Sequence, residues 1–284
     1  AIPGILYFLI FRYVPLFGLI IAFKEDNIFK SIWETDFVGF KYFETFLKYP
    51  EFWKIFRNTL IIALYDIIFT FPGPIITALL LNEIISKRFK KTLQTILYLP
   101  HFLSWVVVGG IFMAALSPSS GIVNQIMGAM GNEPTYFMAE PKYMRAILIS
   151  SGIWKELGWS TIIYLAAIAG IDQSLYEAAY VDGAGRLRQT FEITIPGILS
   201  TIVVMLLLRI GSILTFGFDR TYIFMNGLNS EYIDIFDTYV YRVGLVNAQF
   251  AYTTAIGMFK SVISLTLLLS ANKLSKKLTE KSLF

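Results

Sequence analysis

Residues 58–81 read NTLIIALYDIIFTFPGPIITALLL and contain one charged side chain, that of Asp66. A helix needs roughly 20 mostly apolar residues to cross the ~30 Å hydrocarbon core of a bilayer. This stretch is long enough, and Phe71-Pro-Gly-Pro74 inside it predicts a bend, because proline frees a backbone carbonyl within a helix. We therefore predict a membrane-spanning helix over Asn58–Leu81.

Five other apolar runs predict spanning helices over Ile5–Phe23, Thr92–Leu116, Arg145–Ile171, Pro196–Phe216 and Tyr252–Asn272. The composition agrees, since 56% of the residues are hydrophobic and 15% are charged, whereas soluble domains carry about 25% charged residues. The first run lacks a cleavage-type ending, so we interpret it as a helix and not as a signal peptide. The predicted fold class is all-α, a polytopic membrane protein with six transmembrane helices in one domain over residues 1–284.

The distribution of Lys and Arg predicts the orientation of these helices. Six spans place both termini on one side, together with the segments Asn82–Lys91 and Asp172–Ile195. Basic side chains are dense on that side: Lys87, Arg88, Lys90, Lys91, Arg186, Arg188, Lys273, Lys276, Lys277 and Lys281. Short basic loops stay in the cytoplasm, so we expect cytoplasmic termini, and the net charge of +4 then indicates no nucleic-acid partner. Longer loops, Lys24–Arg57, Ser117–Met144 and Gly217–Ala251, would face outward.

The sequence carries no sign of catalytic chemistry. It has no cysteine, which excludes disulfides and thiolate metal sites, and no Gly-x-x-x-x-Gly-Lys-Ser/Thr phosphate-binding loop. Its one histidine, His101, has no evident acidic or serine partner in the sequence, and we expect it to serve packing or to line a pore. We therefore predict a protein that is not an enzyme and that holds no cofactor or metal.

The cytoplasmic segment Ser174–Pro196 reads SLYEAAYVDGAGRLRQTFEITIP. Ser174 followed by Glu177 is the pattern of a capping box that opens a helix. Gly183 suits the left-handed conformation that ends one, and residues 186–193 predict a second short helix before Pro196 begins the fifth span. These features alone are also compatible with an ordinary connector.

The spacing of Glu177, Ala178, Ala179, Gly183, Ile193 and Pro196 resembles the EAA loop of type I ABC importer permeases, with Ile195 in place of the more usual Leu. The stretches at residues 13–23 (YVPLFGLIIAF), 98–102 (YLPHF) and 152–159 (GIWKELGW) are similar to the oligosaccharide and polysaccharide branch of that family, with an alginate-type permease as one possibility.

This resemblance implies a bacterial inner-membrane subunit that forms half of a translocation path. The implied partners are a second homologous permease, two ATPase subunits that bind ATP and Mg, an extracytoplasmic solute-binding protein, an oligosaccharide and membrane lipid. In the family the loop is a coupling helix that docks onto the ATPase. The resemblance assigns that role to Glu177, Ala178, Ala179, Asp182, Gly183 and Ala184. A stand-alone secondary transporter or channel remains an alternative, although it would leave this pattern unexplained.

Charges inside the predicted spans need a reason, because burying a charge in hydrocarbon is costly. Asp66 lies about 12 Å from the outer end of its span and Arg209 about 20 Å from the inner end of its own, which places them at similar depth. Two interpretations stay open. The charges are satisfied by a mutual ion pair or by hydrogen bonds to the backbone, or Arg209 faces the translocation path and meets sugar hydroxyls or a substrate carboxylate. Aromatic side chains that could stack on sugars are Trp105, Trp154, Trp159 and Tyr164, and Lys155 and Glu156 interrupt the fourth span.

Overall fold

The computed structural model describes residues 2–27, 29–215 and 217–279. Its helices are α1 (Ile2–Phe8), α2 (Lys41–Lys48), α3 (Pro50–Tyr65), α4 (Pro72–Asn82), α5 (Lys87–Tyr98), α6 (Trp105–Ala115), α7 (Ile122–Ala129), α8 (Pro141–Ala169), α9 (Gln173–Val181), α10 (Arg186–Gln189), α11 (Ile195–Gly197), α12 (Leu199–Gly211), α13 (Phe218–Phe224), α14 (Ser230–Ile233), α15 (Phe236–Val240) and α16 (Phe250–Thr279). Short 3-10 and π-helical segments join them: η1 (Leu9–Tyr13), η2 (Val14–Phe23), η3 (Asp66–Thr70), η4 (Leu99–Phe102), η5 (Thr190–Thr194) and η6 (Tyr241–Val246).

Three continuous helical stretches are long and apolar enough to cross a membrane: Ile2–Phe23, Pro50–Asn82 and Phe250–Lys277. Two bent pairs raise the number to five if each counts as one span. The predicted fourth span, Arg145–Ile171, lies in α8 except for its last two residues, and α8 is a continuous helix of 29 residues that ends at Ala169. An all-helical polytopic fold is therefore confirmed for the described residues, and the number of six spans stays a prediction.

The predicted third span is broken, because the helix direction bends by 103° between its two halves. Pro100 lies in η4, where it contributes no N–H, and the backbone at Leu103 is extended. Ser104 then starts α6, since its hydroxyl accepts a hydrogen bond from the Val107 N–H at 3.3 Å. Apolar residues continue through this break, so the hydropathy pattern predicts a single helix there, which is wrong.

The predicted fifth span is bent by 58°, between residues 186–197 and α12. Pro196 lies in the short helix α11, and Ile198 separates it from α12. The prediction that Pro196 opens the long helix is therefore wrong by about one turn. Phe216, the predicted end of this span, and Lys281 in the predicted tail lie outside the described residues.

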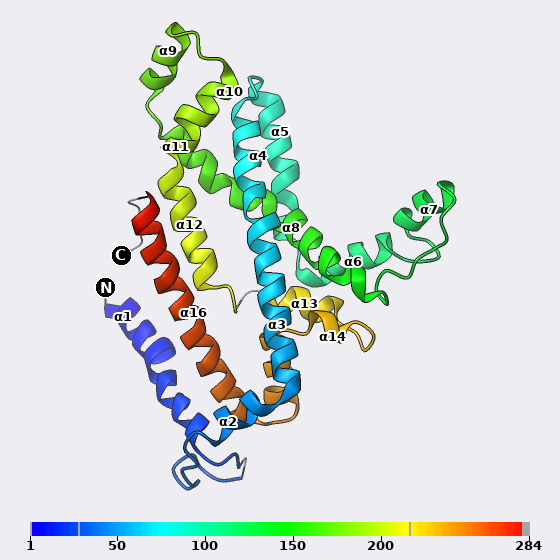
Figure 1. The fold of residues 1–284 in the computed structure, drawn as a ribbon, viewed down its shortest axis with the longest axis vertical. Helices are drawn as coiled ribbons and strands as arrows, with labels where there is room; N and C mark the ends of the chain where they lie inside the picture. Colours follow the sequence, from blue (N-terminus) through cyan, green and yellow to red (C-terminus); the bar gives the residue numbers. More distant parts are fainter. Residues whose placement is uncertain (1, 28, 216, 280–284) are drawn as a thin grey trace.

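The helices form an elongated molecule with α9 at one end and α2 with the loop before it at the other (Figure 1). One core cluster joins η2, α2, α3, α15 and α16 around Phe46, Phe52 and Phe236. A second cluster packs α3 and α8 with the segment from α13 to Ile235, and a third joins α4, α8 and Ile198. The long helix α8 therefore links the middle of the molecule to the segment that carries α9.

Candidate coupling and translocation sites

Helix α9 begins at a different cap from the predicted one. Its N-cap residue is Asp172, whose carboxylate accepts a hydrogen bond from the Ser174 N–H at 3.0 Å. The predicted capping box of Ser174 and Glu177 is therefore wrong, and the first turn starts two residues earlier than Ser174 implied. The hydrogen bonds from Ser174 lower the pKa of the Asp172 carboxyl from its ordinary value. With no capping role, the Glu177 side chain lies exposed on the helix.

Helix α9 ends just before Gly183, as predicted from the sequence. Gly183 has a φ of 78°, in the left-handed region. The Gly183 N–H donates to the Tyr180 carbonyl at 3.0 Å, and the Ala184 N–H donates to the Ala179 carbonyl at 2.8 Å. These bonds satisfy carbonyls of the last turn, which otherwise have no partner. A Cβ atom added at Gly183 would meet nothing within 4 Å, so the backbone conformation alone favours glycine there.

The surface of α9 and of the turn after it is open. No residue of α9 is buried. Glu177, Ala178 and Asp182 are exposed, whereas Ala179 and Ala184 are half-buried. Large apolar side chains project beside them: Leu175, Tyr180, Val181 and Leu187 are 52%, 78%, 83% and 77% exposed. Exposed apolar side chains gathered at one end of a molecule mark an interaction surface.

Two side-chain contacts tie this exposed segment to the helical body. The hydroxyls of Tyr176 in α9 and Thr194 in η5 lie 2.9 Å apart. Arg186 pairs with Glu83, at the end of α4, across 3.3 Å. The predicted second short helix corresponds to α10 followed by η5, so the two contacts join α9 to η5 and α10 to the end of α4.

Asp66 is the centre of a buried charge cluster. Arg220 donates two hydrogen bonds to it, from one guanidinium nitrogen to Oδ1 at 3.1 Å and from the other to Oδ2 at 2.7 Å. Arg209 lies within 3.6 Å of Oδ2. The Arg220 side chain is 1% exposed and that of Arg209 is 21% exposed. The main partner of Asp66 is thus Arg220, and Arg209 is the accessible member of the cluster.

Sequence reasoning missed Arg220 because it follows the predicted fifth span and was assigned to an outer loop. In the structure it lies on α13, and it also donates to the Leu148 carbonyl of α8 at 3.3 Å. Gly152 makes room for it, since a Cβ atom there would lie 2.4 Å from an Arg220 guanidinium nitrogen. Charge balance gave no signal for Arg220, because Arg209 already supplied a cation at the depth of Asp66.

Lys155 holds the broken third span together. Its Nζ donates to the carbonyls of His101 and Leu103, each at 2.6 Å. These carbonyls lie at the bend between η4 and α6, where no helical N–H follows to bond them. Gly158 allows the close approach, because a Cβ atom there would lie 2.1 Å from the Leu97 carbonyl oxygen. Lys155, one of the two charged residues that interrupt the fourth span, therefore has a structural role.

His101 has partners that its sequence neighbours did not reveal. Its Nδ1 lies 3.1 Å from the Glu156 carboxylate, and its ring stacks on Trp159 with centroids 4.5 Å apart and planes at 2°. The expectation that His101 has no acidic partner is therefore wrong. Glu156 is also close enough for its charge to act on Arg209. We call four side chains the polar row: His101 and Glu156, which are in contact, and Arg209 and Asp66, which form a second contact.

The four aromatic candidates divide into two kinds. Trp154 and Trp159 are 39% and 45% exposed, and the Trp105 ring lies 5.7 Å from the Lys155 ammonium. Tyr164 is 2% exposed and packs with Ala78, Ile168 and Ile198 in the third core cluster. Trp159 stacks on His101 and keeps part of its ring exposed, whereas Tyr164 serves packing in this structure.

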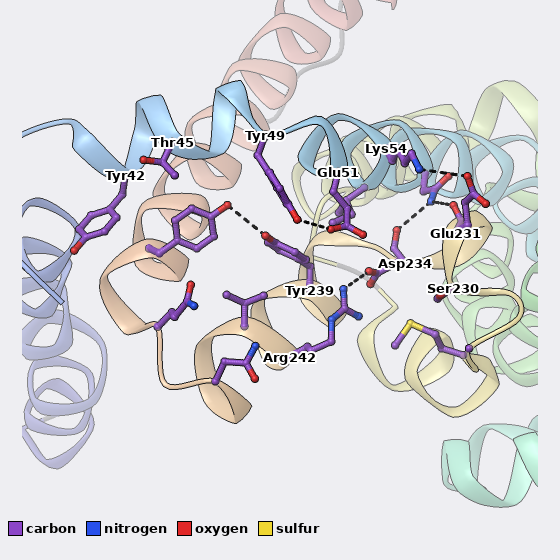
Figure 2. A pocket seen from close by; sticks show the side chains of 18 of the residues that line it. Tyr42, Thr45, Tyr49, Glu51, Lys54, Ser230, Glu231, Asp234, Tyr239 and Arg242 are labelled. Carbon is purple, nitrogen blue, oxygen red and sulfur yellow. Dashed lines mark hydrogen bonds and ion pairs between the residues drawn. The ribbon is translucent and has the colours of Figure 1, made fainter. Parts of the chain in front are cut away.

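A cavity of about 1170 Å³ lies at the end of the molecule opposite α9. Figure 2 shows its two sides, with Tyr42, Tyr49 and Glu51 on one and Tyr239 with Arg242 on the other. Arg242 pairs with Asp234 at 2.6 Å, and the Tyr49 hydroxyl donates to Glu51 at 2.9 Å, which raises the pKa of Tyr49. The lining is polar, and among the described residues no cluster of His, Cys, Asp and Glu could hold a metal ion.

The polytopic fold and the exposed α9 turn are those expected of a permease. A family model described as "Binding-protein-dependent transport system inner membrane component" matches residues 71–280. The chain belongs to this family. This permease is therefore a membrane component of an ABC importer and is not itself catalytic, because ATP hydrolysis belongs to separate subunits in the family.

This permease is similar along its whole length to named proteins. The polygalacturonan/rhamnogalacturonan transport system permease protein YteP of Bacillus subtilis (strain 168) is 45% identical over 100% of this chain and 88% of its own length. A crystal structure of a bacterial ABC transporter that imports the acidic polysaccharide alginate contains a chain 42% identical, with a TM-score of 0.90 over 98% of this chain and 93% of that one. A second crystal structure shows a bacterial alginate ABC transporter in complex with a periplasmic protein that binds an alginate pentasaccharide. It contains a chain that is 41% identical, with a TM-score of 0.92 over 99% of this chain and 94% of that one.

Proposed function

We propose that this permease forms half of the translocation path for an acidic oligosaccharide and is driven by an ATPase that docks on α9. The observation that carries the proposal is the exposed α9 turn, held out from the helical body with Glu177 on its surface. The proposed topology has six spans with both termini in the cytoplasm. The proposed partners are a second homologous permease, two ATPase subunits with ATP and Mg, and an extracytoplasmic solute-binding protein.

Docking would use two kinds of contact on α9. Ala178 and Ala179 have short side chains, so another surface can approach the helix backbone closely. Tyr180 and Val181 then offer apolar area that is exposed in the single chain. Asp182, Gly183 and Ala184 set the turn that presents this surface. An ATPase that moves on nucleotide binding would displace α9 and, through the Tyr176–Thr194 and Arg186–Glu83 contacts, η5 and the end of α4.

Within the membrane, the path would follow the polar row that ends at Arg209. Arg220 bonds both oxygens of Asp66, and Arg209 is a second arginine beside the same carboxylate. Arg209 is the more accessible of the two. A guanidinium can bond a carboxylate through two parallel hydrogen bonds, which suits a uronic acid residue. Trp159, stacked on His101, would offer a face for the sugar ring.

The relatives support an acidic sugar as the substrate. Polygalacturonan is named for YteP and alginate for the transporters in the crystal structures. Both names denote polymers of uronic acids. Their negatively charged carboxylates are complementary to the positive charge of Arg209. A solute-binding protein is supported by the structure in which a periplasmic protein holds an alginate pentasaccharide.

The test is to reconstitute the complex and to measure ATP hydrolysis stimulated by its binding protein, with neutral and uronic oligosaccharides offered in parallel. We expect stimulation by uronic oligosaccharides. Arg209→Met should abolish transport in a complex that still assembles, and Arg209→Lys should retain part of it. Stimulation by neutral sugars alone, or full transport of uronides by Arg209→Met, would overturn the acidic-substrate assignment.

A further inference from the structure

A groove of about 620 Å³ runs between α3, η3 and the first half of α8. Its walls are mainly apolar: Tyr65 and Phe69 come from α3 and η3, and Ala146, Ile149 and Ile153 come from α8. Its polar groups are few, and the Ser150 hydroxyl is already bonded to the Ile147 carbonyl at 3.1 Å. Such a lining accepts hydrocarbon in preference to a sugar, whose hydroxyls would lack partners there.

Cations gather at one end of this groove only. Lys142 and Arg145 lie on α8 at its mouth. Arg57 of α3 does not line the groove, but it directly precedes Asn58, whose side chain accepts a hydrogen bond from Arg145. Arg57 and Lys142 are exposed. In the part of the chain that the structure describes, none of the three lies within ion-pair distance of a carboxylate. The mouth therefore carries a net positive charge that no described acid balances.

Arg145 also has a structural duty that the other two lack. It donates to the Asn58 side chain at 3.0 Å and to the Tyr232 carbonyl at 3.2 Å. These bonds fix its guanidinium at the mouth of the groove and join α8 to α3 and α14. Lys142 and Arg57 are consequently the residues that can be changed without loosening the fold.

The length of the groove matches one leaflet of a bilayer. Lys142 and Ile153 are eleven residues apart on one helix, which corresponds to about 17 Å at the rise of an α-helix. Half of a ~30 Å hydrocarbon core is about 15 Å. An amphiphile with its headgroup at the three cations would therefore place its acyl chain along Tyr65, Phe69 and Ile153, down to the middle of the membrane.

We propose that this groove binds a phospholipid with an anionic headgroup, such as phosphatidylglycerol. The phosphate meets Arg57, Lys142 and Arg145, and an acyl chain fills the apolar part. The inference uses the proposed topology only to name the leaflet, which is the outer one. It does not depend on the transported sugar.

The test is native mass spectrometry of the assembled complex, reconstituted in equal amounts of phosphatidylglycerol and phosphatidylethanolamine. We expect phosphatidylglycerol to be retained preferentially, with the preference falling about fivefold for each cation removed in Arg57→Gln and Lys142→Gln. Lys48→Gln is the matched control, since Lys48 is an exposed lysine on α2 that pairs with Glu44; its preference should equal that of the wild type. An unchanged preference in the double variant would overturn the proposal.

Site specificity is checked with a phosphatidylglycerol that carries a photoreactive acyl chain. Labelled peptides should come from residues 65–69 and 142–153 and should disappear in the double variant. Label on a partner permease at this place, with none on these residues, would show that protein covers the groove. Stimulated ATP hydrolysis measured on the same samples reports on the proposed function separately, so failure of one does not imply failure of the other.

Discussion

Arg220 and Asp66 form a bidentate ion pair in the interior of the chain, with donor–acceptor distances of 2.7 and 3.1 Å. The pair joins α13 to the middle of the second spanning helix, and Gly152 of α8 lets the guanidinium pass. Arg209 approaches the same carboxylate at 3.6 Å and is more exposed. The two arginines therefore differ in role: one holds three elements together, and the other presents a charge.

This difference predicts different effects of removing each arginine. Arg220→Met leaves Asp66 with the Thr70 hydroxyl at 3.1 Å and the longer Arg209 contact, and breaking a buried pair by removing one partner costs about 3–5 kcal/mol. Arg209→Met leaves both hydrogen bonds of Arg220 in place and should cost less than half of that. The measurement is the thermal unfolding midpoint of the purified complex. Equal losses for the two variants would contradict this division of roles.

Lys155 should be a stability residue although it lies in a span. Lys155→Met removes the donor to the His101 and Leu103 carbonyls, and each buried acceptor left without a partner costs about 1–3 kcal/mol. We expect a lower unfolding midpoint and a lower yield of assembled complex. Lys91→Met is the matched control, because Lys91 is exposed on α5. A Lys155→Met complex as stable as this control would show that the two carbonyls find other partners.

The N-cap of α9 should make the coupling segment sensitive to acid. The pKa of Asp172 is lowered from 3.8 by the hydrogen bonds from Ser174. A lowered pKa in the folded state means that the cap stabilises the helix fully above pH 3.8 and loses this effect as the pH falls through the lowered pKa. Hydrogen exchange of the α9 amides, corrected for intrinsic rates, should therefore quicken below that range.

The control for this acid effect is Asp172→Asn. Asparagine offers the same capping oxygen but does not titrate, so its exchange should stay constant with pH. Asp172→Ala, which has no acceptor, should exchange quickly at every pH. If the Asn variant showed the same acid-induced increase as the wild type, protonation of Asp172 would not be its cause.

The sequence predicted those parts of the fold that depend on local chemistry. Long apolar runs marked α3–α4, α8 and α16, since burial in a membrane requires them, and Gly183 marked the end of α9 by its backbone freedom. The bend at Leu103 was not predictable from hydropathy. Its carbonyls are bonded by Lys155, which is 52 residues away, and only the tertiary fold brings the two together.

Only one of the two arginines that contact Asp66 was predictable from the sequence, because the other is brought to it by the tertiary fold. Similar depth in two predicted spans suggested that Asp66 and Arg209 meet, and they do. Arg220 comes from a segment that the hydropathy pattern assigned to a loop, so its depth could not be estimated. His101 and Glu156 likewise belong to different helices, and their contact at 3.1 Å depends on the close packing of α5 on α8 at Gly158.

The turn at Gly183 gives the sharpest test of coupling, because Gly185 offers a matched control two residues away. Gly183 has a φ of 78° and Gly185 a φ of −70°, and neither would bring a new Cβ atom within 4 Å of another group. Alanine at Gly183 therefore meets only the backbone penalty of about 1–2 kcal/mol for the left-handed conformation, whereas alanine at Gly185 meets none. We expect Gly183→Ala to reduce ATP hydrolysis stimulated by the loaded binding protein, with basal hydrolysis and assembly retained, and Gly185→Ala to behave as the wild type. Equal stimulation in both variants would mean that the shape of this turn does not matter for docking, and that coupling depends on another surface.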